Sequence, residues 1–131
     1  MEKLPNKIFN RCKQIPFNQL IYVSRTGGKY FFGGVRYRRK GKECIYYIVP
    51  NNINPEIPNI KGIEKEELEK LWKILKQKEI IKTDDLKIDL PELYIEGGCC
   101  FTAFFGVINF LFPDTFLKGH SYIKILNNEN K

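Results

Sequence analysis

Residues 30–49 read YFFGGVRYRRKGKECIYYIV, two runs rich in aromatic and β-branched residues on either side of a basic turn. Runs of this composition favour strands, so we predict that residues 30–38 and 43–49 form an antiparallel hairpin. Lys40 and Gly41 supply the turn, where a glycine can take a positive φ without steric strain. We therefore expect the chain to build an antiparallel sheet around this hairpin.

A two-residue turn also fixes which side chains share a face, because it places Arg38 opposite Glu43 and so determines the register of the other cross-strand pairs. The face predicted to be core holds Val35, Tyr37, Cys44, Tyr46 and Ile48. The face predicted to meet solvent holds Arg36, Arg38, Glu43, Ile45 and Tyr47. Gly33 and Gly34 interrupt the first strand and indicate a β-bulge or a close approach of the backbone.

Two helices are predicted to pack against this sheet. Residues 64–77 show the apolar spacing i, i+3, i+4 and i+7 of an amphipathic helix. Its apolar positions are Leu68, Leu71, Trp72 and Leu75. Residues 99–112 are apolar nearly all round, which indicates a helix that is buried at the centre of the core.

The other segments complete the predicted order of elements. We predict short strands at 20–23, near 93–95 and at 121–126, and a short helical turn at 83–86. We predict an irregular segment at 1–19, a loop rich in Pro and Asn at 50–62, and a frayed tail at 127–131. This order favours an α+β fold for a single domain over residues 1–131. It has a small antiparallel β-sheet with a basic β-hairpin, packed against one buried apolar helix and one amphipathic helix.

Charge is concentrated in the first third of the chain. Residues 1–45 carry eleven Lys or Arg against two Glu, a net charge of +9, whereas residues 46–131 carry eleven against thirteen, a net charge of −2. A positive surface attracts polyanions, and Tyr or Phe can stack on unpaired bases. We therefore predict a small basic nucleic-acid-binding protein, for DNA or for RNA. Its predicted binding residues are Lys29, Arg36, Tyr37, Arg38, Arg39, Lys40, Lys42 and Tyr47.

The same basic hairpin permits two other interpretations. It could dock on an acidic protein, which would make the chain an interaction module such as an inhibitor or an accessory factor from a mobile element. It could also be a surface hairpin whose charges only protect a sheet edge, with Arg38 and Glu43 as an ordinary cross-strand pair.

A second candidate site is GGCCFTAF, residues 97–104, together with His120. A cysteine at a helix N-terminus gains thiolate character from the unpaired backbone amides. This short segment resembles papain-like cysteine hydrolases, in which the nucleophile precedes an aromatic residue on the first turn of a buried helix. The resemblance implies a small cysteine hydrolase with Cys100 as nucleophile and His120 as base. The same segment also fits two small residues that let a core helix pack closely.

A third candidate site is acidic. Metal-dependent nucleases need two or three carboxylates within reach of one ion, and this chain has five between positions 84 and 96. They are Asp84, Asp85, Asp89, Glu92 and Glu96. A solvated acidic segment accounts for the same residues.

The leading interpretation is a non-enzymatic protein without a cofactor, and the hydrolase and nuclease interpretations leave an enzyme open. The four cysteines form no C-x-x-C pair, so we expect reduced, mostly buried thiols rather than a metal site. The N-terminus shows no signal peptide, and the fourteen-residue apolar run 99–112 is shorter than the roughly twenty residues of a membrane span. We expect a cytoplasmic location and no membrane partner, and the sequence specifies no oligomeric state.

Overall fold

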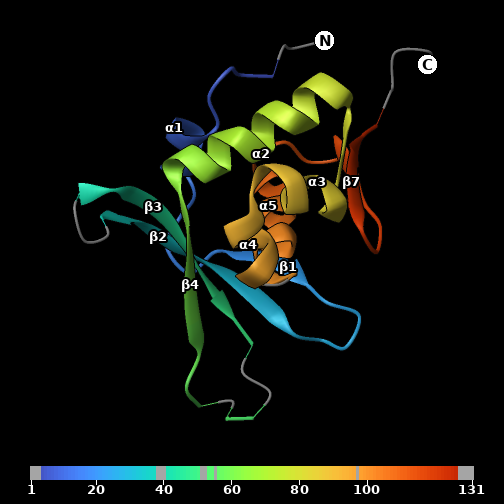
Figure 1. Ribbon diagram of the computed structural model, residues 1–131. Helices are drawn as coiled ribbons and strands as arrows, with labels where there is room; N and C mark the ends of the chain where they lie inside the picture. Colours follow the sequence, from blue (N-terminus) through green and yellow to red (C-terminus); the bar gives the residue numbers. More distant parts are fainter. Residues whose placement is uncertain (1–3, 38–40, 51–52, 55, 97, 127–131) are drawn as a thin grey trace.

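The computed structural model describes residues 4–37, 41–50, 53–54, 56–96 and 98–126. In these residues, seven strands form two antiparallel sheets that pack with five helices, which confirms the predicted α+β class (Figure 1). The elements are α1 (Phe9–Cys12), β1 (Leu20–Val23), β2 (Lys29–Tyr37), β3 (Glu43–Val49), β4 (Asn59–Glu64), α2 (Lys65–Lys78), β5 (Ile80–Lys82), α3 (Thr83–Asp89), α4 (Pro91–Glu96), α5 (Cys99–Leu111), β6 (Phe116–Lys118) and β7 (Tyr122–Ile125).

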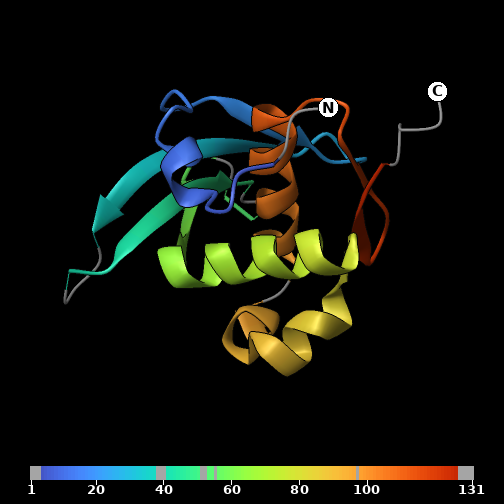
Figure 2. The same ribbon diagram turned by 90° about the horizontal axis from the view of Figure 1, so that it is seen from above.

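The larger sheet is a four-stranded meander in the order β1-β2-β3-β4, and the smaller sheet has the order β5-β7-β6. Helix α5 lies at the centre of the molecule, between the larger sheet and α2 (Figures 1 and 2). The buried side chains of both sheets and of the helices join in one continuous core. One face of the larger sheet is therefore committed to packing.

The two predicted long helices are confirmed. In α2, Leu68, Leu71 and Leu75 are fully buried, as the predicted spacing requires. The helix begins with a reciprocal capping box, in which the Glu67 carboxylate accepts from the Glu64 amide at 2.9 Å. Helix α5 is buried along most of its length, as its composition predicts.

The predicted pairing register of the hairpin is wrong. Tyr37, not Arg38, pairs with Glu43, so the turn is longer than two residues and β3 presents the opposite faces to those expected. The residues of β3 that join the core are Ile45, Tyr47 and Val49. Tyr46 and Ile48 lie on the other face, together with Cys44, which is buried as predicted. The predicted bulge at Gly33 and Gly34 is confirmed, since the register shifts between Phe32 and Val35. Gly41 has the positive φ expected of the turn, 74°.

Several shorter elements differ from the prediction. The strand expected near 93–95 is the helix α4, and Leu93 is buried from it. The segment 1–19 contains the short helix α1, whose first amides, those of Ile8 and Phe9, both donate to the Glu69 carboxylate at 2.8 Å. The expected loop 50–62 already contains the start of β4, and β5 and β6 were not predicted. The predicted tail 127–131 lies outside the described residues.

Over the part of the chain that the structure describes, none of the helices has the length and apolar character needed to cross a membrane.

Candidate nucleic-acid interface

The four-stranded sheet has one face that no described helix covers, and we call it the outer face. The pairing register shows which side chains lie on the outer face, because Phe32 and Tyr47 are paired and both enter the core. The residues next to them therefore point the other way. They form one row across all four strands: Leu20, Phe31, Ile48 and Ile60. The two ends of this row are open to solvent, with Leu20 42% and Ile60 58% exposed.

Beside this apolar row lie Tyr46 and Arg36. Tyr46 occupies the outer face of β3, where the Arg36 guanidinium carbon lies 5.8 Å from the centroid of its ring. Among the residues that the structure describes, no carboxylate lies within ion-pair distance of Arg36 or of the exposed Lys29. The outer face therefore combines aromatic rings with cations that are open to an external anion.

The predicted binding residues divide into four groups. Lys29 and Arg36 are exposed, and Tyr37 is 71% exposed although it belongs to the face predicted to be core. Tyr47 is only 1% exposed and packs in the core, so the prediction that it contacts bases is wrong. The cause is the longer turn, which exchanges the two faces of β3. Arg38, Arg39 and Lys40 lie outside the described residues.

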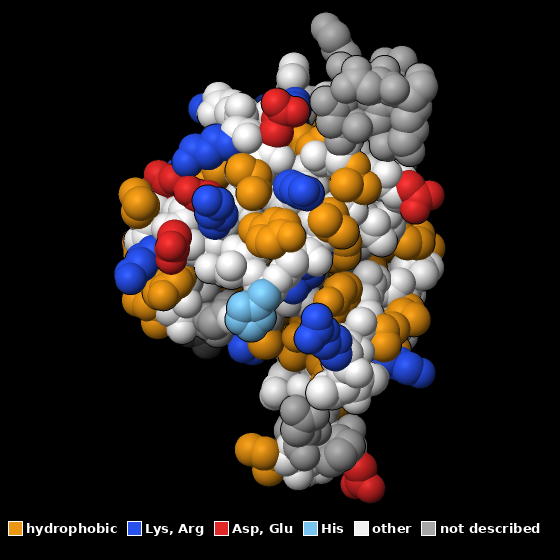
Figure 3. Space-filling model, turned by 90° about the vertical axis from the view of Figure 1, so that its right-hand side faces the viewer, with side chains coloured by type: hydrophobic (Ala, Val, Ile, Leu, Met, Phe, Trp, Pro, Cys, Tyr) orange, Lys and Arg blue, Asp and Glu red, His pale blue; other side chains and the backbone are white. Residues whose placement is uncertain are grey.

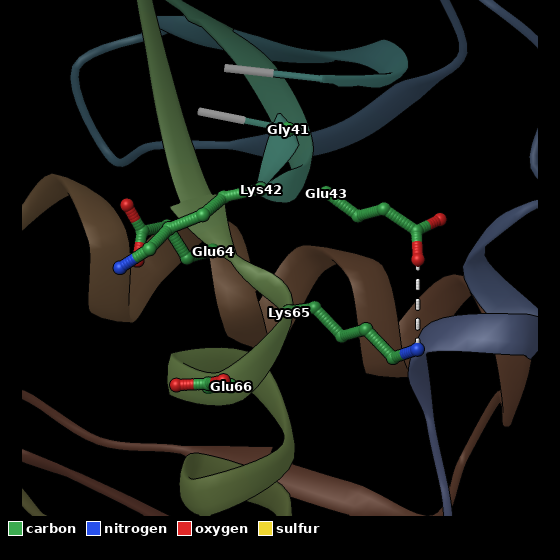
Figure 4. A pocket seen from close by; sticks show the side chains of 6 residues that line it. All are labelled: Gly41, Lys42, Glu43, Glu64, Lys65 and Glu66. Atoms are coloured by element: carbon green, nitrogen blue, oxygen red, sulfur yellow. Dashed lines mark ion pairs between the residues drawn. The ribbon is translucent and has the colours of Figure 1, made fainter. Parts of the chain in front are cut away.

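Lys42, the remaining predicted residue, belongs to a network of ion pairs at the base of the hairpin (Figure 4). Its ammonium lies 3.6 Å from the Glu64 carboxylate, and Lys65 lies 3.6 Å from Glu43. Lys13 approaches the other Glu43 oxygen at 3.9 Å. A small cavity of about 120 Å³ is bordered by Lys42, Glu43, Glu64 and Lys65. Such exposed pairs add little stability, but they offset the charge of Lys42 and join the hairpin to α2.

The predicted set of binding residues does not include Phe31 and Tyr46. The hydrophobic pattern assigned Tyr46 to the core, because aromatic residues alternate on both faces of β3. No local pattern locates it, because the register beside Tyr46 is set by the length of the turn.

The candidate cysteine nucleophile, Cys100, is not accessible from the surface. The Cys100 side chain is buried, and its thiol donates to the Leu93 carbonyl at 3.5 Å. His120 is exposed in the connection between β6 and β7, and Figure 3 shows the histidine at the surface. A buried thiol lacks the access that a catalytic nucleophile needs. The arrangement therefore does not favour the hydrolase interpretation.

Next to it, Cys99 is partly exposed and accepts a long hydrogen bond, 3.9 Å, from the Tyr30 hydroxyl. Burial, and then the adjacent Cys99 thiol, raise the pKa of Tyr30 to about 12. The phenol is thus protonated at neutral pH and acts as the donor. All four thiols are free, and three of them are buried.

The acidic segment is divided between the helices α3 and α4. Within the described residues, no three His, Cys, Asp or Glu side chains are grouped so that they could hold a metal ion. Asp85 has a structural role, because its carboxylate accepts from the Lys82 amide at 2.8 Å and lies 3.1 Å from the Lys78 ammonium. Partial burial opposes ionisation, yet the hydrogen bonds from Lys82 and Lys78 hold the pKa of Asp85 below its ordinary value.

We expect the Asp85→Asn variant to lower the free energy of unfolding by about 0.5–1 kcal/mol at neutral pH, because it removes a charged cap from α3. A carboxyl whose pKa is lower in the folded state stabilises the fold above its unfolded pKa, and this contribution disappears as the pH falls through the folded pKa. Urea unfolding of both proteins between pH 7 and pH 2 measures the difference. A gap that stays constant with pH would contradict the assignment.

No protein-family model matches the chain, and no curated protein or solved structure is significantly similar to it.

Proposed function

We propose that this protein binds nucleic acid through the outer face and the adjoining basic hairpin. The observation that carries the proposal is the placement of Arg36 and Lys29, which are exposed on β2 with no described carboxylate nearby. Both belong to the third of the chain that carries a net charge of +9. A polyanion gains from such a surface through phosphate contacts and the release of counterions.

The hairpin also offers groups that recognise more than charge. Tyr37 stands exposed at the end of β2, directly after Arg36. A guanidinium can donate two parallel hydrogen bonds to a phosphate, and a tyrosine ring can stack on a base or a sugar. The sequence continues with Arg38, Arg39 and Lys40, which supply three further cations to the same hairpin.

The triple variant Arg36→Ala, Arg38→Ala and Arg39→Ala tests this proposal. Fluorescence anisotropy with labelled oligonucleotides over a salt series gives the slope of log affinity against log salt. We expect the wild-type protein to bind at low salt with a steep negative slope, and the triple variant to bind more weakly with a slope that is shallower by roughly 2–3.

A matched control removes the same charge from another surface. Lys70, Lys73 and Lys87 are exposed on α2 and α3, and their replacement by alanine should leave the slope unchanged. If the two triple variants weaken binding equally, the interaction depends on net charge alone. If the wild-type protein binds no oligonucleotide at low salt, the proposed function is wrong.

A second candidate function, that of a protein-interaction module, is favoured by the apolar surface of α3 and α4. Ile88 and Ile95 are 79% and 81% exposed, which is unusual for isoleucine. They lie on the same two helices that border a cavity of about 300 Å³, lined in part by Leu86, Tyr94 and Phe101. Apolar docking of this kind gains little from low salt, so the same salt series separates the two functions.

A further inference from the structure

On the outer face, Tyr46 has a glycine next to it on each neighbouring strand of the larger sheet. Tyr46 is paired with Gly62 on β4, and the bulge brings Gly33 beside it on β2. A Cβ atom on Gly33 would lie 3.1 Å from both the carbonyl carbon and the carbonyl oxygen of Tyr46. Gly33 therefore lets the β2 backbone approach Tyr46 closely, and Arg36 of the same strand lies over the Tyr46 ring.

A second ring lies close by on the same face. Phe31 is paired with Ile48, which is two residues from Tyr46 along β3. Diagonal neighbours in an antiparallel pair are about 7–8 Å apart, within reach of aromatic side chains. Phe31 and Tyr46 are thus adjacent aromatic groups on one surface, and both are partly exposed.

Cations flank the two rings. Lys29 precedes Phe31 by two residues on β2 and so shares its face, and Arg36 lies over the Tyr46 ring. A guanidinium can stack on an aromatic ring and still donate hydrogen bonds to an anion at its edge. The face therefore presents two rings with a positive charge at each end.

We propose that the outer face is a binding site for single-stranded nucleic acid. Unpaired bases stack on Phe31 and Tyr46, and the flanking phosphates contact Lys29 and Arg36. The inference rests on the proposed function and names its substrate class. Charge complementarity favours a polyanion over other occupants, and the rings favour unpaired bases, because the faces of paired bases are covered by their neighbours in a duplex.

The test compares a labelled single-stranded DNA, an RNA of the same sequence and the corresponding DNA duplex at one low salt concentration. We expect the wild-type protein to bind single strands at least roughly 10-fold more tightly than duplex. The Phe31→Leu and Tyr46→Leu variants keep apolar bulk but lose a ring, so each should weaken single-strand binding by roughly 5- to 100-fold. Their duplex affinity and salt slope should not change, and the DNA and RNA arms show which strand is preferred.

Three controls keep the result interpretable. Tyr46→Phe keeps the ring and should keep the affinity, whereas Tyr94→Leu removes an exposed ring of α4, outside the sheet, and should have no effect. Circular dichroism checks that each variant is folded.

Three outcomes would overturn the inference. Equal binding of single strands and duplex, with no effect of ring loss, would reject it but leave nucleic-acid binding intact. No binding of any oligonucleotide would reject the proposed function as well. Dimers in light scattering that Tyr46→Leu dissociates would show that a second copy of the chain occupies this face.

Discussion

Replacement of Trp72 by alanine should lower the free energy of unfolding by about 3–5 kcal/mol, the usual cost of deleting a large buried aromatic side chain. Trp72 is fully buried on α2. Its ring stacks on Phe112 at a centroid distance of 5.8 Å and meets Phe116 edge-on at 5.9 Å. Its indole N–H donates to the Pro5 carbonyl at 2.9 Å, so the substitution also leaves that carbonyl without this donor.

Urea unfolding followed by far-ultraviolet circular dichroism is the suitable measurement, because Trp72 is the only tryptophan and its fluorescence is lost in the variant. Trp72→Phe, which keeps most of the ring but not the hydrogen bond, should lose less. Lys73→Ala changes the adjacent exposed residue and should stay within about 0.5 kcal/mol of the wild-type protein. A loss below about 1 kcal/mol for Trp72→Ala would mean that the packing of α2 against 112–116 is not as described.

Trp72 illustrates what the sequence could predict. The spacing of Leu68, Leu71 and Leu75 around it is a local property of one helix, and local periodicity indicates which face is buried. The same spacing could not show that Trp72 reaches back to Pro5, because that contact joins residues far apart in the chain. The capping of α1 by Glu69 was missed for the same reason.

The sequence predicted the positive charge of the candidate site but not which side chains of β3 face it. The excess of Lys and Arg in residues 1–45 is visible in the composition, and Arg36 is exposed as its place on the predicted solvent face requires. The faces of β3 were not predictable, because aromatic and aliphatic residues alternate without a polar face and the hydrophobic pattern fits either register. The turn decides between them, and a difference of one residue moved Tyr47 into the core and Tyr46 out of it.

The prediction of a strand near 93–95 was wrong because a short apolar run does not specify the type of secondary structure. A short apolar run after a proline fits either a strand or a helical turn, and Leu93 is the single residue of this run that is buried. Packing of α4 next to α5, where Leu93 accepts from the Cys100 thiol, selects the helix. A tertiary contact therefore determined the local structure, and a short window of sequence does not contain that information.

The Gly106→Ala variant should lose about 1–3 kcal/mol of unfolding free energy, although alanine is the better helix former by about 0.5–1 kcal/mol. Gly106 lies in the middle of α5, and a Cβ atom there would lie 2.8 Å from the Ile21 carbonyl oxygen of β1. A backbone atom cannot rotate away as a side chain can, so α5 and β1 must separate. Leu20, at the end of the outer-face row, lies next to Ile21 and would move with it.

Chemical unfolding of Gly106→Ala beside Thr102→Ala separates packing from helix propensity, because Thr102 lies on the same helix but is partly exposed. Thr102→Ala should be neutral or slightly stabilising, since alanine is the better helix former there too. If Gly106→Ala instead stabilised the protein by the amount that helix propensity predicts, α5 would not be in backbone contact with β1. The position of the first strand of the outer face would then need another explanation.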